Sequence, residues 1–163
     1  MTTSSALLKA ATVTRGDALE FAARTLKNLQ ALEAAHERGE SVHLVTQMVN
    51  SLLGLIVFPL EKRFVRFLLK QQLDDLVARG WPSWAFSLDR SDTLGDLVYH
   101  LRNAVAHGRI TFSSDSRNPS EVALEVADAR PKTQEIYWRA SIGATDLRHF
   151  CVRYAKLLED VIG

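Results

Sequence analysis

The sequence predicts an α+β protein that is mostly helical, with about four to five helices in a bundle and a small antiparallel β meander inserted before the C-terminal helix. Apolar residues recur at three- and four-residue steps along much of the 163-residue chain, which indicates amphipathic helices. Short apolar runs replace this period after residue 108, and helical spacing returns from about residue 145. We expect a single domain over residues 1–163, with residues 1–16 as a loosely ordered N-terminal tail.

The composition indicates an ordinary globular protein, with 47% hydrophobic and 24% charged residues. The net charge of +1 creates no strong overall field for nucleic acid, so an RNA partner would need a local basic surface. A single cysteine, Cys151, excludes an internal disulfide framework and a multi-cysteine zinc site, and agrees with a reducing cytoplasm. The most apolar stretch, residues 52–58, is far shorter than the ~20 residues that span a bilayer. We therefore expect a soluble, cytoplasmic protein.

Two helices are predicted in the first third of the chain. Residues 17–38 place leucines and alanines at helical steps, and Gly39 ends the pattern. Residues 42–58 are apolar nearly all round except for one narrow polar stripe, which includes Asn50. A helix of this kind lies in the middle of a bundle.

A third helix is predicted over residues 59–79, because Pro59 fits the first turn of a helix and Gly80 ends it. The segment WPSWAFSLDRSD, residues 81–92, reads as a loop. Its two tryptophans, Trp81 and Trp84, are expected to pack this loop against the bundle.

A fourth helix is predicted to begin near Thr93, where Asp96 stands three residues later as a capping partner, and to end at His107 before Gly108. After it, the runs ITF, VALEV and EIYW predict the strands of the meander. The last helix is expected over residues 145–162, with Cys151 on its apolar face.

The fourth helix contains the segment LRNAVAHG, residues 101–108, which mixes polar and apolar residues in an unusual way. At 100° per residue, one polar stripe holds Asp96, His100, Asn103 and His107. This stripe can be an ordinary solvated face. However, a histidine in a last helical turn suits proton exchange near neutral pH, and the guanidinium fork of Arg102 fits phosphate oxygens. Together these groups favour a phosphate-ester site without a metal or other cofactor.

The order Arg102-Asn103, three residues, then His107 near a helix end resembles the R-x4-6-H motif of the HEPN superfamily (higher eukaryotes and prokaryotes nucleotide-binding domain), including the common Asn after Arg. DTLGDLVYHLRNAVAHGRITF and the earlier VNSLLGLIVFPLEK are similar to a plasmid-borne HEPN subgroup. The resemblance, which runs from about Val49 to Phe112, implies a HEPN-like fold and a metal-independent endoribonuclease. It also implies a homodimer that joins its motif helices into one composite cleft, and a role as a toxin or phage-defence effector with an antitoxin partner.

Carried over by position, the resemblance implies that Arg102 stabilises the phosphorane, His107 transfers a proton, and Asn103 orients the histidine or holds the phosphate. On a straight helix Arg102 projects about 140° away from His107, so a partner chain could supply the missing group. Many HEPN toxins carry a modifiable tyrosine two places after the histidine, and Arg109 stands there in this chain. The alternative is a non-catalytic HEPN adaptor that binds RNA or a partner protein through the same cleft.

Three further residues are candidates for supporting roles. Asp96, one turn before His100, could fix the imidazole of His100 for acid or base chemistry, or could simply cap the helix. Asn50, beside Ser51, could face the motif or belong to a polar pair bonded to a neighbouring helix. No metal is expected, because His100 and His107 lie about 10 Å apart along the helix and cannot share one zinc ion.

RNA contacts are predicted, more weakly, for three basic residues: Arg109, Lys62 and Arg66. Lys62 and Arg66 belong to a basic stripe that alternates with phenylalanines at positions 64 and 67. Such a stripe is more often a solvated face whose aromatic neighbours pack into the core.

Overall fold

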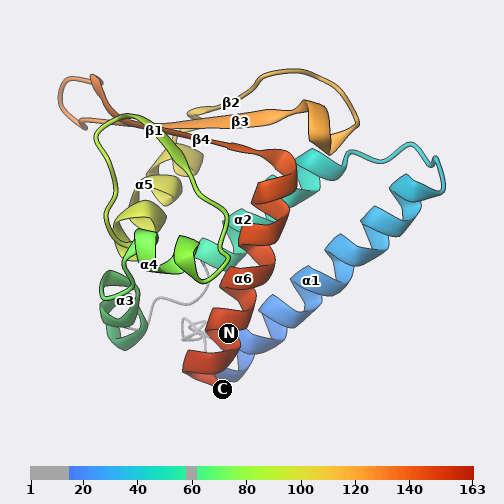
Figure 1. The fold of residues 1–163 in the computed structure, drawn as a ribbon, viewed down its shortest axis with the longest axis horizontal. Helices are drawn as coiled ribbons and strands as arrows, with labels where there is room; N and C mark the ends of the chain where they lie inside the picture. The colour runs from blue at the N-terminus through green and yellow to red at the C-terminus, as the bar shows by residue number, and fades with distance from the viewer. Residues whose placement is uncertain (1–14, 58–61) are drawn as a thin grey trace, which may run out of the picture.

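The computed structural model describes residues 15–57 and 62–163, which combine six α-helices with one four-stranded antiparallel sheet. The sheet lies across one end of the molecule and the helices extend away from it (Figure 1). The mixed helix and sheet composition agrees with the predicted class. Of the predicted tail, residues 1–14 lie outside the described residues, and Arg15 and Gly16 already belong to the first helix.

Three long helices form the body of the bundle: α1 (Arg15–Glu37), α2 (Leu44–Val57) and α6 (Ala144–Ile162). Each contacts the other two, and in Figure 1 α1 and α6 diverge near the sheet and converge toward the C-terminus. Leu29 of α1 and Met48 of α2 are fully buried, as periodic leucines and an almost wholly apolar α2 predict. These helices confirm the predicted ones, apart from one to two residues at the ends; the predicted end of α2 at residue 58 lies outside the described residues.

The prediction of a single helix over residues 59–79 was wrong, because the chain forms two helices there, α3 (Lys62–Leu69) and α4 (Leu73–Ala78). Between them, the carbonyl of Gln71 accepts a hydrogen bond from the Leu94 N–H at 2.9 Å, and the Leu73 N–H donates to the Asp92 carbonyl at 2.8 Å. The helix stops because these backbone groups pair with a distant segment, which no local pattern indicates. The predicted start at Pro59 lies outside the described residues.

The sheet has the order β1-β4-β3-β2. Its members are β1 (Ala85–Leu88), β2 (Ile110–Phe112), β3 (Ala123–Ala129) and β4 (Ile136–Gly143). The predicted meander is confirmed as β2, β3 and β4. The loop predicted for residues 81–92 was wrong in part, because β1 lies within it and extends the sheet by pairing with β4.

The strand β1 escaped prediction because it lacks the alternation that marks a half-buried strand. Ala85, Ser87 and Leu88 are exposed, and only Phe86 packs inward, edge to face against Trp138 at 6.1 Å between ring centroids. The two loop tryptophans do pack on the bundle as predicted, since Trp81 and Trp84 each meet Phe150 of α6 at 5.6 Å.

Helix α5 (Leu94–Ala106) lies between α3 and the strand β3. Thr93 and Asp96 form a complete capping box at its start, which confirms the predicted pair. At its end, Gly108 donates to the Val105 carbonyl, and the next N–H donates to Ala104, which together make a Schellman motif. The glycine at 108, with φ of 64°, therefore sets the direction in which the chain leaves the helix.

We expect Gly108→Ala to lower the free energy of unfolding by about 1–2 kcal/mol, the cost of a left-handed conformation for a residue with a Cβ. A Cβ at this position would meet nothing within 4 Å, so the cost comes from the backbone alone. Gly108→Asn should lose less, because asparagine tolerates this conformation. Thermal denaturation should give the highest melting temperature for the wild type, an intermediate one for Gly108→Asn and the lowest for Gly108→Ala. Equal melting temperatures for all three would contradict the role of Gly108 in ending α5.

Candidate functional site

Two candidate residues of the α5 motif, Arg102 and His107, are exposed to solvent. Neither Arg102 nor His107 makes a side-chain hydrogen bond or ion pair within residues 15–57 and 62–163. His107 is the C-cap residue of α5, and only its backbone N–H is used, by the Asn103 carbonyl at 3.1 Å. Both side chains are therefore free to meet a ligand.

Arg102 and His107 lie on different sides of α5. Gly95 marks the side toward α3, because a Cβ there would meet Leu69, and Arg102 follows Gly95 by two helical turns on that side. His107 follows Asn103 by one turn, on the side toward β3. The angular separation expected from the sequence therefore corresponds to two different neighbours of the helix.

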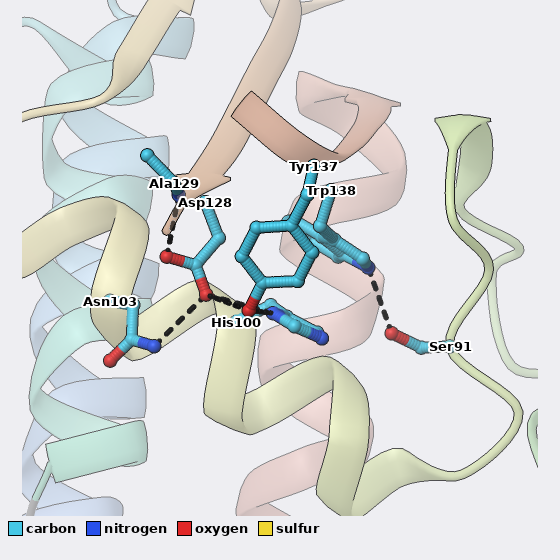
Figure 2. Close-up of polar contacts among 7 residues, drawn as sticks. All are labelled: Ser91, His100, Asn103, Asp128, Ala129, Tyr137 and Trp138. Carbon is cyan, nitrogen blue, oxygen red and sulfur yellow. Dashed lines mark hydrogen bonds and ion pairs between the residues drawn. The ribbon is translucent and has the colours of Figure 1, made fainter. Parts of the chain in front are cut away.

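A buried carboxylate, Asp128 of β3, joins this second side of α5 to the sheet (Figure 2). Asp128 is 2% exposed. Its Oδ2 atom accepts from His100 Nδ1 at 2.9 Å, from Asn103 Nδ2 at 2.9 Å and from the Tyr137 hydroxyl at 3.1 Å. Its Oδ1 atom accepts from the backbone N–H of Ala129 at 2.8 Å. One carboxylate thus holds two residues of the predicted site.

The hydrogen bonds keep Asp128 ionised despite its burial. Burial alone raises the pKa of a carboxyl, but the donors from Asn103, His100, Tyr137 and Ala129 outweigh it and hold the pKa of Asp128 below its ordinary value of 3.8. Burial and then the charge of Asp128 raise the pKa of Tyr137 to about 12, so its hydroxyl remains a donor. An ionised carboxylate can only accept, and this assigns the proton of the His100–Asp128 contact to Nδ1 of the imidazole.

Aromatic rings hold the imidazole of His100 from several sides. Its ring stacks on Trp138, with centroids 4.6 Å apart and planes 15° apart, while the rings of Tyr99 and Tyr137 lie steeply inclined to it at centroid distances of 5.3 and 5.6 Å. The Trp138 indole is fixed in turn by donating to Ser91 Oγ at 3.0 Å (Figure 2). The His100 side chain is 15% exposed, and its Nε2 atom makes no hydrogen bond within the described part of the chain.

Asp96 does not fix His100, which was one of the two roles considered for it. Its carboxylate accepts from the Thr93 backbone N–H at 3.3 Å and so completes the helix cap. The carboxylate that orients His100 is Asp128, which sequence reasoning missed. A signal was present, because an aspartate within the apolar strand VALEVADA must find partners if it is buried.

The remaining predicted residues are spread around the molecule. Asn50 is exposed on α2 and makes no side-chain hydrogen bond within the described residues, while its neighbour Ser51 is 3% exposed with an unpaired hydroxyl. Arg109 donates to Gln134 Oε1 at 2.7 Å, which holds it against the β3–β4 turn. Arg66 is exposed on α3, and Lys62 begins α3 with a side chain outside the described residues.

The comparison with protein families matches residues 8–162 to the family described as HEPN pEK499 p136. The chain belongs to this HEPN family. The resemblance inferred from the motif is therefore confirmed, and membership of this HEPN family indicates a nuclease or another RNA-related effector in general terms. Neither the curated proteins nor the solved structures yielded a match. No helix within the described ranges is long and apolar enough to cross a membrane.

In this HEPN chain, the face of α5 that meets β3 combines three kinds of group. His100 and His107 can exchange protons, Asn103 retains a carbonyl oxygen and one amide hydrogen, and Asp128 supplies a fixed negative charge behind them. The arrangement suits proton transfer at an anionic ligand, provided that a positive charge such as that of Arg102 also reaches the ligand.

We expect Asp128→Ala to lower the free energy of unfolding by about 1–3 kcal/mol, because three side-chain donors lose their acceptor. Since folding lowers the pKa of Asp128, its stabilisation is present above the ordinary value of 3.8 and is lost as pH falls through the lower folded value. The stability gap between wild type and variant should therefore shrink below about pH 4, as denaturant unfolding at several pH values can measure.

Asp115→Ala is the matched control, because Asp115 is exposed and makes no side-chain hydrogen bond within the described residues. It should change stability by less than about 0.5 kcal/mol at every pH. The difference in free energy of unfolding between wild type and Asp128→Ala should be present at neutral pH and shrink in acid. Its absence at neutral pH, or an unchanged difference in acid, would contradict the role given to the buried carboxylate.

Proposed function

We propose that this HEPN chain is a metal-independent endoribonuclease, which cleaves RNA through its own 2′-hydroxyl at a composite site shared by two copies. The observation that supports it most is that Arg102 and His107 both lie near one end of α5, both exposed and neither in a side-chain hydrogen bond or ion pair among the described residues. The HEPN family match adds the expectation of an RNA-directed role.

The chemistry needs a proton acceptor, a proton donor and a positive charge, because RNA already contains the nucleophile. The 2′-oxygen attacks phosphorus as its proton leaves, and the bond to the 5′-oxygen breaks as that oxygen gains a proton. In the proposal, the guanidinium of Arg102 stabilises the charge on the phosphorane oxygens, and His107 transfers a proton. Asn103, which Asp128 holds in place, contacts the phosphate through its remaining amide hydrogen.

The second copy is proposed because α5 leaves a face uncovered. Tyr99, Arg102, Asn103 and Ala106 recur at the three- and four-residue steps of one helix face. Tyr99 is 57% exposed, and tyrosine is enriched at interface cores. Arg102 and His107 flank this face on opposite sides. A homodimer that packs its two α5 helices across this face would bring Arg102 of one protomer toward His107 of the other.

The biological role is proposed from the family alone: a toxin or phage-defence effector that an antitoxin protein restrains. Arg109, at the place of the modifiable tyrosine, does not suit control by modification there. Arg109, Lys62 and Arg66 remain proposed contacts to RNA. The alternative, an adaptor that binds RNA or protein without cleavage, uses the same exposed groups and differs only in the outcome of an activity assay.

We expect the purified protein to cleave RNA in EDTA and to leave 2′,3′-cyclic phosphate and 5′-hydroxyl ends, because the 2′-oxygen is the nucleophile. Deoxyribose at the cut site should abolish cleavage. His107→Ala should be inactive yet change stability by under ~0.5 kcal/mol, since the side chain is exposed. His149→Ala, an exposed histidine of α6, is the matched control and should retain activity.

Two outcomes of this assay oppose the proposal in different ways. Ends with 3′-hydroxyl groups, or a strict requirement for Mg²⁺, would exclude the 2′-hydroxyl mechanism. Binding of RNA without cleavage, across total RNA and its purified classes, would favour the adaptor.

We expect the protein to be a dimer in which Arg102→Ala and His107→Ala complement each other. A purified heterodimer of the two variants contains one site with both groups intact, so it should recover up to about half of the wild-type activity. Size-exclusion chromatography with light scattering measures the dimer, and the cleavage assay measures the recovery. A monomer with full specific activity at high dilution would exclude the composite site.

A further inference from the structure

The imidazole of His100 is immobilised at one nitrogen and has no hydrogen bond at the other within the described residues. Nδ1 bonds to the buried Asp128 carboxylate, the ring stacks on Trp138, and Nε2 has no hydrogen bond within the described part of the chain (Figure 2). Because an ionised Asp128 keeps the proton on Nδ1, neutral His100 carries its lone pair on Nε2. This carboxylate–imidazole arrangement is the one that orients a histidine for general-base chemistry.

The position of His100 relative to His107 suits an in-line displacement at the phosphorus atom of the RNA backbone. The two lie on one side of α5, seven residues or about 10 Å apart along its axis. In such a reaction the attacking and leaving oxygens stand on opposite sides of phosphorus. A phosphorus with two in-line oxygens and one hydrogen bond of about 2.8 Å to each oxygen spans roughly 9 Å. The rise of the helix between the two residues is of the same order, so imidazoles from both positions can be directed at one phosphate. Asn103 lies between the two histidines along the helix and keeps one amide hydrogen for a phosphate oxygen.

We propose that His100 is a second catalytic residue of the ribonuclease site and that Asp128 is the residue that positions it. The proposal rests on the proposed function. Nε2 of neutral His100 accepts the proton of the 2′-hydroxyl as the 2′-oxygen bonds to phosphorus. Protonated His107 donates to the 5′-oxygen as its bond to phosphorus breaks. One proton thus moves from the 2′- to the 5′-oxygen through two imidazoles, and exchange with water resets both.

The same geometry determines which protomer supplies each group of the proposed site. His100 and His107 serve one phosphate from a single protomer, because they share one side of one helix. Arg102 lies about 140° away from His107 and serves the phosphate held by the partner. Asp128 touches no RNA, since its oxygens are buried and occupied by four donors.

The decisive variant is His100→Asn, because an asparagine amide can still donate to Asp128 but has no titratable nitrogen. We expect kcat/KM to fall about 10²- to 10⁴-fold with little change in melting temperature. The wild-type pH profile of kcat/KM should be bell-shaped, and the variant should lose the limb that reports the base. His100→Gln, whose amide extends toward the place of Nε2, gives the same measurement if His100→Asn does not fold.

A substrate with sulfur in place of the 5′-oxygen separates the two histidines. A thiolate leaves without a proton, so this substrate should restore most of the rate of His107→Ala and none of the rate of His100→Asn. Asp128→Asn should lower kcat with little effect on KM and alter the same limb of the pH profile, as expected for a positioning residue. If the sulfur substrate instead restored the rate of His100→Asn and not that of His107→Ala, the assignment of His100 as base and His107 as acid would be overturned.

Heterodimers test which protomer supplies each group. His100→Asn paired with Arg102→Ala should recover activity, whereas His100→Asn paired with His107→Ala should not, because each site then lacks one histidine. An inactive wild type in EDTA would refute the proposed function itself. An active wild type whose His100→Asn variant keeps its rate and both pH limbs would refute only the role of His100.

Discussion

The hydrogen-bonded contact between the Asp128 carboxylate and helix α5 is the constraint on which the rest of this site depends. A buried charge is tolerable only where donors surround it, and here three side chains and a backbone N–H do so. Two of those side chains, His100 and Asn103, stand one turn apart on α5. Satisfying the carboxylate therefore fixes the rotation of the motif helix against the sheet.

Once α5 is held in this way, its two sides acquire different properties. The side toward β3 carries His100, which is backed by Trp138 and the ionised Asp128. The opposite side carries Arg102, which is exposed and makes no side-chain hydrogen bond or ion pair among the described residues. In the proposed ribonuclease, this separation of the positive charge from the histidines is the reason for drawing Arg102 from a second protomer.

The ends of α5 matter as much as its faces. The capping box of Thr93 and Asp96 begins the helix beside the backbone hydrogen bonds that separate α3 from α4. The Schellman motif at Gly108 ends it at once after His107 and turns the chain into β2. His107 is thereby left at a helix terminus with its side chain exposed to solvent.

The sequence by itself determined the features that depend on neighbouring residues: the long helices, both ends of α5, the three-strand meander and the motif that indicated a HEPN family. Periodicity, caps and turns are local, so residues a few positions apart specify them. Only the tertiary structure decided the break near Gln71, the strand β1 and the partner of His100. Each of these joins segments distant in sequence: Gln71 pairs with Leu94, Ala85 with Ser141, and Asp128 with a histidine 28 residues earlier. A buried carboxylate must find donors, but which donors it finds depends on how strands and helices pack, and no spacing along the chain encodes that choice directly.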